Sequence, residues 1–352
     1  MRNIVVRALT FFTRNVLSKD DLNEEFQYAG EVLNYVENEL KKMNMEVFTK
    51  RISFTGLSRE LTHELINHAP KDILISIGYS KNLTLEDIVQ LAENGLYIPL
   101  IYNQDPNLDK ARFFSRVIHK ASEKDPAAST RISIGFHDES FQTPYFPDSS
   151  SRGHRSIGLS FIYPKHLIYY IQLGYTIENA FVKVFEEFQR VAILVNELTK
   201  LPVYIDYSLS PWMENSIVEL YNMLGFRILE PGSLYFTWIL NKYIDLYSNK
   251  LSRTGFNEVM LPYAEDALLL EYGAAGLIKA RDFLFYASTC VAGVDMIVVP
   301  EDESKLALMI ASEMALSRVK SKPMSFRAIP VQSKPGDLVE LGKFGKVPVI
   351  PY

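Results

Sequence analysis

The alternation of short β-rich runs with helical patterns along the whole chain is the feature that most constrains its fold. Between most of the runs, apolar residues recur at the three- and four-residue steps of an amphipathic helix. The runs cover residues 3–12, 45–54, 72–76, 96–102, 131–136, 155–162, 202–207, 226–229, 294–299 and 324–329. This order predicts parallel strands joined by right-handed helical crossovers, as in an α/β barrel or a doubly wound sheet. Because no Ser/Gly-rich linker divides the chain, we expect one closed α/β barrel of about ten strands over residues 1–352.

Three helices are indicated by their own signals. The clearest covers about residues 176–200, where apolar residues form one stripe and charged residues the opposite face. Ser18 with Asp21 three residues later resembles a capping box, and Asp302 precedes a run that ends in basic residues. The helices are therefore expected to pack one face on a sheet.

The stretch from His137 to His154 shows neither a strand nor a helix periodicity, and it contains Pro144, Pro147 and three consecutive serines. It is long for a connection in a compact domain, and such loops are usually functional lids or mobile excursions. We expect it to be irregular.

Charge and cysteine content narrow the class of protein. Thirty-seven basic against forty-two acidic side chains, without a long basic run, argue against a nucleic-acid partner. With Cys290 alone, no internal disulfide can form, and a reducing, cytoplasmic location is expected. The longest apolar stretch is interrupted by Asp295, and the N-terminus has a charge within its apolar residues, so neither a membrane span nor a signal peptide is predicted.

Familiar cofactor and metal motifs are missing from the sequence. No P-loop occurs, and Gly273 to Gly276 follows a helical rather than a strand pattern. His63 and His68 are five residues apart and so do not share a helix face. The adjacent His137, Asp138 and Glu139 are more typical of a polar loop than of a metal site. The sequence therefore identifies no cofactor and no metal.

Candidate functional residues concentrate where β-rich runs end. Ligands of α/β proteins bind beyond the carboxyl ends of strands, which is where Glu301, Asp302, Asp206 and Ser208 fall. Asp302 is equally suited to capping its helix, and Cys290 is either a nucleophile or a small apolar core residue.

Arg327 is a lone charge within a β-rich run. Its guanidinium cannot lose its proton, so burial in a strand requires a carboxylate or an anionic ligand beside it. The sequence leaves both alternatives open.

Several motifs of the C-terminal third resemble those of an uncharacterised family described as pyruvate-formate-lyase-like. They are Cys290, then V-D-M-I-V-V-P-E-D at 294–302, K-P-M-S-F-R-A-I-P at 322–330 and G-D-L-V-E-L-G at 336–342. D-Y-S-L-S-P at 206–211 and P-Y-A-E-D at 262–266 are similar to two further family motifs. The resemblance implies a ten-stranded α/β barrel like that of pyruvate formate-lyase and anaerobic ribonucleotide reductase. It implies no established activity.

The chain departs from that pattern at two places. Gly158 to Pro164 replaces a glycine-rich turn whose backbone amides could hold an anion. Gly336, Gly342 and Gly345 lack the surroundings expected of a glycyl radical. Radical lyase chemistry is therefore not expected.

The expected function is binding of a small anionic metabolite at the strand ends, with Arg327 as the pairing cation. The protein would be either an enzyme of unknown reaction or a non-catalytic metabolite sensor or structural homo-oligomer. Homo-oligomers are suggested by the many aromatic residues, including Tyr163, Tyr169, Tyr170 and Tyr175. The residues expected to act in catalysis are Cys290, Asp206, Asp295 and Asp302, and those expected to contact the ligand are Arg327, Ser208, Glu265, Asp266 and Glu301.

Overall fold

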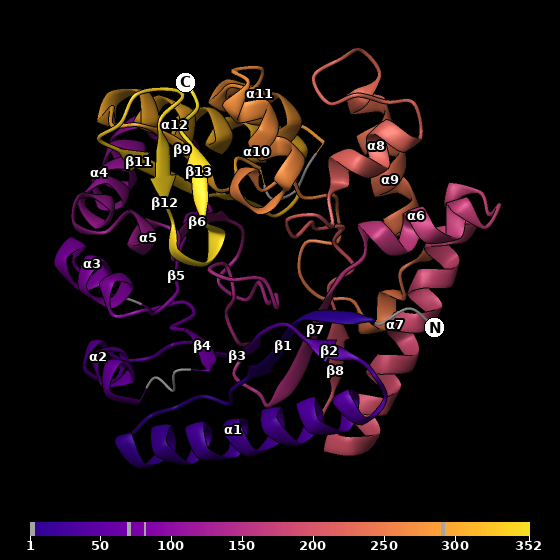
Figure 1. Ribbon diagram of the computed structural model, residues 1–352. Helices are drawn as coiled ribbons and strands as arrows, with labels where there is room; N and C mark the ends of the chain where they lie inside the picture. The colour runs from indigo at the N-terminus through magenta and orange to yellow at the C-terminus, as the bar shows by residue number, and fades with distance from the viewer. Residues whose placement is uncertain (1–3, 69–71, 81, 290–292) are drawn as a thin grey trace.

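Strands occupy the middle of the molecule and helices surround them (Figure 1). The computed structural model describes residues 4–68, 72–80, 82–289 and 293–352. The strands are β1 (Val5–Phe12), β2 (Glu46–Val47), β3 (Lys50–Ser53), β4 (Ile73–Ser76), β5 (Ile98–Ile101), β6 (Ile132–Phe136), β7 (Ser156–Ile162), β8 (Val203–Ile205), β9 (Ile297–Pro300), β10 (Met324–Phe326), β11 (Ala328–Val331), β12 (Leu338–Glu340) and β13 (Lys346–Pro348).

The helices form the outer part of this mixed α/β fold. They are α1 (Lys19–Lys42), α2 (Arg59–His68), α3 (Leu85–Glu93), α4 (Leu108–Lys124), α5 (Pro126–Ser129), α6 (Pro164–Gln172), α7 (Ile177–Thr199), α8 (Ile217–Met223), α9 (Ser233–Tyr247), α10 (Ala267–Ala274), α11 (Ala280–Ala287) and α12 (Glu303–Lys320). Short 3-10 turns are η1 (Lys250–Ser252), η2 (Tyr263–Glu265) and η3 (Gly342–Phe344). The three helices indicated by sequence signals are confirmed as α1, α7 and α12, and Ser18 and Asp302 cap the first and the last of them.

The strands of the described residues pair in four sheets. The largest has the order β4-β3-β1-β7-β8 with β2 beside β1, and the others are β10-β6-β5, β11-β9 and the hairpin β12-β13. Continuous pairing around one closed barrel is therefore not present. The pairing is also not wholly parallel, since β7 runs antiparallel to β1 and β10 antiparallel to β6.

Single bridges and hydrogen bonds connect some of these sheets to their neighbours. Ser76 at the end of β4 pairs with Tyr97 just before β5. Leu209, which follows β8, pairs with Val259, and the Tyr263 N–H donates to the carbonyl of Asp295 over 2.9 Å. Strands β10 and β11 are separated only by Arg327. The order of the segments thus continues from one sheet to the next.

One predicted run, residues 226–229, is not a strand. Phe226 follows Gly225 at φ 81°, and its ring stacks on Phe236 of α9 with centroids 4.4 Å apart. Leu229 adopts φ 71°, a left-handed conformation that ends an extended run. The segment is a turn into α9, because packing against that helix outweighs its β propensity.

The two faces of the largest sheet differ in polarity. Phe11 packs edge-on against Tyr28 of α1, and Phe161 stacks on Phe188 of α7 at 3.8 Å, so these apolar side chains face helices. The opposite face carries Thr10 of β1, Arg51 and Ser53 of β3, and Ser76 of β4. Side chains alternate between the faces of a strand, which separates the two sets.

The segment 137–154 is irregular, as expected, but it is not an outer lid. Residues 142–151 are all buried. Their backbone carbonyls accept hydrogen bonds from the polar face of the sheet: Arg51 donates to Pro144 over 3.0 Å and Ser76 to Ser149 over 2.7 Å. The segment lies inside the molecule because the strands offer it the donors that solvent would otherwise supply.

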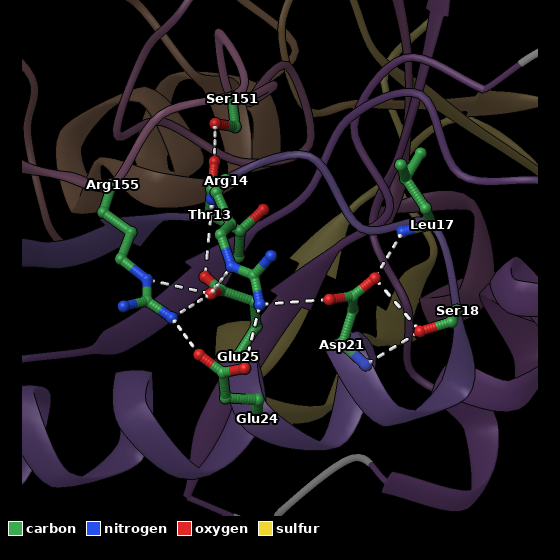
Figure 2. A network of polar contacts seen from close by, with 9 residues as sticks. All are labelled: Thr13, Arg14, Leu17, Ser18, Asp21, Glu24, Glu25, Ser151 and Arg155. Atoms are coloured by element: carbon green, nitrogen blue, oxygen red, sulfur yellow. Dashed lines mark hydrogen bonds and ion pairs between the residues drawn. The ribbon is translucent and has the colours of Figure 1, made fainter.

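A polar network connects helix α1 with residues next to β1 and β7 (Figure 2). The fully buried carboxylate of Glu25 in α1 accepts from Arg14, which follows β1, and from Arg155, which precedes β7. The Ser151 hydroxyl donates to the carbonyl of Thr13. These contacts hold helix α1, the ends of β1 and β7, and the buried segment 137–154 together. This segment is called the inner segment below.

Candidate functional site

A small buried cavity brings together charged residues from both halves of the chain. Its volume is about 40 Å³. The charged residues that line it are Arg7 (β1), Arg51 (β3), Asp148 (inner segment), Glu265 (η2), Asp295 (before β9), Arg327 (between β10 and β11) and Lys343 (η3). Aromatic side chains of Tyr97, Tyr145, Phe146, Trp212 and Phe344 complete the walls. Three of the predicted residues, Glu265, Asp295 and Arg327, therefore meet at one site.

Arg7 reaches the cavity because β1 has a bulge. The pairing of β1 with β7 moves from Val6–Phe161 to Ala8–Ser160, so Arg7 is the extra residue with no partner across the strands. Bulges change the direction of a side chain relative to regular alternation. The Arg7 guanidinium donates to the carbonyl of Pro211 over 2.6 Å and forms an ion pair with Glu265.

Arg327 is held by two carboxylates. It donates to both oxygens of Asp295, over 2.6 and 3.0 Å, and to Glu265 over 3.1 Å. Burial would raise the pKa of Glu265, but the Arg7 and Arg327 guanidiniums lower it below its ordinary value. The ion pairs thus form a chain of alternating charge: Arg7, Glu265, Arg327 and Asp295. The protein itself therefore supplies the carboxylates that Arg327 needs beside it.

Arg51 forms no ion pair among the described residues. Only 6% of the residue is exposed, and the groups that it contacts are neutral: the Thr49 hydroxyl, the Pro144 carbonyl and the Phe146 ring, 5.0 Å from Cζ. Burial lowers the pKa of Arg51 to about 10, and the charge of Arg7 acts in the same direction. A buried guanidinium in this state favours an anion beside it.

Burial raises the pKa of two carboxyl groups of the cavity. The pKa of Asp295 rises to about 6, against the opposing effect of Arg327. The pKa of Asp148, whose carboxylate accepts a 2.6 Å hydrogen bond from Ser325, is raised as well. Burial thus favours the neutral form of both carboxyl groups.

The remaining predicted residues lie elsewhere. Asp206 is buried and accepts from the Ser208 hydroxyl over 2.6 Å, from Thr143 and from the backbone N–H groups of Phe256 and Asn257. Asp206 and Ser208 do not line the cavity, although Ser210 does. Their hydrogen bonds fix the loop after β8.

Three further predicted acids do not line the cavity. Asp266 caps α10 and accepts from Ser216 and the Ile217 N–H, and Asp302 caps α12 through the Lys305 N–H. Glu301 is exposed, and its own N–H donates to Val331. Cys290 lies outside the described residues. Asp266 and Asp302 thus have the helix-capping role that the sequence left open for Asp302.

The sequence reasoning missed Arg7, Arg51, Asp148 and Lys343. Arg7 carries the signal that singled out Arg327, a lone charge within a β-rich run. Arg51 does not, because Lys50 and Glu46 lie in the same run. Asp148 and Lys343 give no comparable signal, because their position depends on where an irregular segment and a turn fold.

Two kinds of feature are absent from the described residues, a metal-binding group and a membrane span. Within residues 4–68, 72–80, 82–289 and 293–352, no group of three His, Cys, Asp or Glu side chains is arranged to hold a metal ion. In the same part of the chain, no helix combines the length and apolar character required to cross a bilayer.

Comparison with known families identifies the chain's relatives. The profile of the family described as "Uncharacterised ACR (DUF711)" matches residues 162–342, just over half of the chain. The chain belongs to this family. The matched stretch contains Glu265, Asp295 and Arg327, whereas Arg7, Arg51, Asp148 and Lys343 lie outside it.

Individual members of the curated relatives align over shorter parts. The UPF0210 protein of Pyrobaculum aerophilum is 31% identical over 151 residues, which are 40% of this chain and 33% of the relative. That of Lactiplantibacillus plantarum is 29% identical over 185 residues, 50% of this chain and 41% of the relative. The UPF0210 protein of Methanosarcina barkeri is 37% identical over 101 residues, which are 28% of this chain and 22% of the relative. The chain thus spans well under half of each of these relatives, and their names state no activity.

Proposed function

We propose that the protein binds a small anionic metabolite in the central cavity. The observation that carries this proposal is Arg51, a buried cation whose contacts among the described residues are neutral. Because the chain from Arg7 to Asp295 balances its own charges, Arg51 and Lys343 together outweigh Asp148 and leave the cavity with a positive excess. An anion beside Arg51 would offset the cost of burying that charge.

The size of the cavity limits the ligand. A volume of about 40 Å³ exceeds the roughly 10–15 Å³ that one water requires, but it is far smaller than a drug-sized pocket. A carboxylate of two to four carbons suits these dimensions. Arg51 would bind its oxygens, and the rings of Tyr97 and Phe146, which are 5.2 Å apart, would contact its carbon atoms.

We also propose that the ten strands of β4-β3-β1-β7-β8, β10-β6-β5 and β11-β9 belong to one barrel related to pyruvate formate-lyase. The resemblance of the C-terminal motifs supports this relation, and so do the bridges Ser76–Tyr97 and Leu209–Val259 between neighbouring segments. A cytoplasmic location is proposed on the composition alone, because one cysteine permits no internal disulfide.

Association with a second copy of the chain is a further part of the proposal. Tyr235, Trp238 and Leu246 of α9 are 60, 53 and 56% exposed. Their spacing of three and eight residues puts them on one side of the helix. Exposed aromatic side chains of this kind concentrate at protein interfaces.

The ligand-binding proposal is tested by thermal unfolding in acetate, lactate or succinate, each compared with chloride at equal ionic strength. We expect at least one carboxylate to raise the melting temperature, because a ligand that binds only the native state stabilises it by mass action. Arg51→Gln should abolish that rise. Arg112→Gln, which removes an exposed arginine paired with Asp109 in α4, is the matched control and should keep it. A rise that persists in Arg51→Gln would contradict the proposed site.

A further inference from the structure

We propose that a second pocket, at the carboxyl ends of β5 and β6, binds the phosphate group of a phosphomonoester. The pocket has a volume of about 460 Å³, within the range of small-molecule sites. It is separate from the central cavity, since the two share no lining residue. This inference does not depend on the proposed function of the cavity.

Four parts of the chain converge on the pocket. Asn103 follows β5, Phe141 follows β6, Arg152 comes from the end of the inner segment, and Arg318 and Lys322 come from the end of α12 and the turn after it. Carboxyl ends of neighbouring parallel strands are where α/β proteins place ligands, and β5 and β6 are parallel. The location therefore favours a binding site over an incidental surface hollow.

The two arginines are oriented chiefly by neutral groups. Arg318 donates to the Asn103 side-chain oxygen over 3.1 Å and to the Gln104 carbonyl over 3.2 Å, and its nearest carboxylate is the fully exposed Asp105 at 3.9 Å. The side chain of Arg152 donates to the Ser140 carbonyl over 3.1 Å. Neutral acceptors fix the guanidiniums without cancelling their charge, which is the state in which arginine binds phosphate oxygens.

Of the other charged side chains of the pocket, Lys322 forms an ion pair with the buried carboxylate of Glu258. Asp138 accepts from the neutral Asn103 amide and keeps its negative charge. Arg152 and Arg318 therefore supply the positive charge available to a ligand, against one carboxylate. Two guanidiniums from different elements match a dianionic phosphate better than a carboxylate with one charge.

Aromatic side chains line part of the pocket, and they would contact the organic part of the ligand. The Phe141 ring lies 4.2 Å from the His137 ring and 4.8 Å from Phe256, and it is only partly buried. Tyr102 and Phe136 line the same pocket. A phosphomonoester, with an apolar or ring-shaped body beside its phosphate, therefore fits this pocket better than free phosphate.

The experiment compares ribose 5-phosphate, inorganic phosphate and ribose by calorimetric titration of the full chain at constant ionic strength. We expect ribose 5-phosphate to bind most tightly, inorganic phosphate more weakly and ribose not measurably. Arg152→Gln and Arg318→Gln should each weaken ribose 5-phosphate binding at least tenfold, because each removes charge-assisted hydrogen bonds. Arg152 is exposed and makes one side-chain hydrogen bond, so its variant should fold normally.

Arg51→Gln and Arg112→Gln serve as controls and should keep the phosphate affinity of the natural chain. Loss of phosphate binding in Arg51→Gln, with retention in Arg152→Gln, would place the phosphate in the central cavity and overturn the inference. Absence of binding by both phosphates in the natural chain would overturn it as well. Neither result bears on carboxylate binding in the central cavity, which the thermal unfolding experiment measures separately.

Discussion

At the scale of single residues, His137 shows how tightly the interior is packed around a polar group. Its ring lies between Gly135 and Phe141, and a Cβ added at Gly135 would come within 2.2 Å of the His137 Nε2 atom. Nδ1 contacts the Asp138 carbonyl at 3.1 Å, and Nε2 has no hydrogen-bond partner among the described residues. Burial lowers the pKa of His137 from 6.5 to about 4.

This shift makes stability depend on pH. The unfolded chain binds a proton at His137 near pH 6.5, whereas the folded chain does so only near pH 4, so stability falls as the pH decreases through that window. Between pH 7 and pH 5 the loss should be about 2 kcal/mol. Urea unfolding of the natural chain and of His137→Phe at both pH values tests this. The loss should be smaller by that amount in the variant, and equal losses in both proteins would show that His137 is not the group responsible.

At the scale of elements, α1 is joined to the sheet by one buried acid and one exposed acid (Figure 2). Glu25 is fully buried and Glu24 is 61% exposed at its side chain, yet both form ion pairs with Arg14 and Arg155. The same two arginines therefore contact carboxylates in very different surroundings.

The pair predicts unequal effects of the same substitution. Glu25→Gln should lower the free energy of unfolding by about 2 kcal/mol, since it removes a buried carboxylate that accepts charge-assisted hydrogen bonds from Arg14 and Arg155. Glu24→Gln should cost less than about 1 kcal/mol, because exposed ion pairs contribute little. Urea unfolding of both variants in low salt provides the comparison. Equal losses would mean that burial of Glu25 has no energetic consequence.

The elements also show which parts of the fold a sequence can predict. The helix at Ile177–Thr199 was predictable because its apolar stripe repeats over many turns and Thr176 caps it. The bulge at Arg7 was not, because it depends on the register of β1 against β7, two strands about 150 positions apart. Burial of the inner segment was not predictable either. It depends on carbonyl groups of that segment accepting hydrogen bonds from Arg51 and Ser76, which lie far from it in the sequence. Of the seven charged residues that line the cavity, three were therefore predicted from the sequence: Glu265, Asp295 and Arg327.

At the scale of the whole molecule, the exposed stripe on α9 bears on assembly. If Tyr235, Trp238 and Leu246 form a contact between copies, light scattering should return a multiple of 40.3 kDa at micromolar concentration. Trp238→Lys should shift the mass toward one chain, because a charge would be buried in the contact. Leu338→Lys, at an exposed position of the β12–β13 hairpin, is the control and should leave the mass unchanged. A mass of 40.3 kDa for the natural chain throughout this range would reject association.

The division of the central cavity between two parts of the chain has a consequence for the family. Residues 162–342 contribute two carboxylates and one arginine, whereas the rest of the chain contributes three cations and Asp148. The matched stretch therefore supplies a net negative set of cavity residues, and the cations on which the proposed anion binding depends lie outside it, in β1, in β3 and at Lys343. Similarity over residues 162–342 alone would therefore not carry the proposed preference for anions from this chain to a relative.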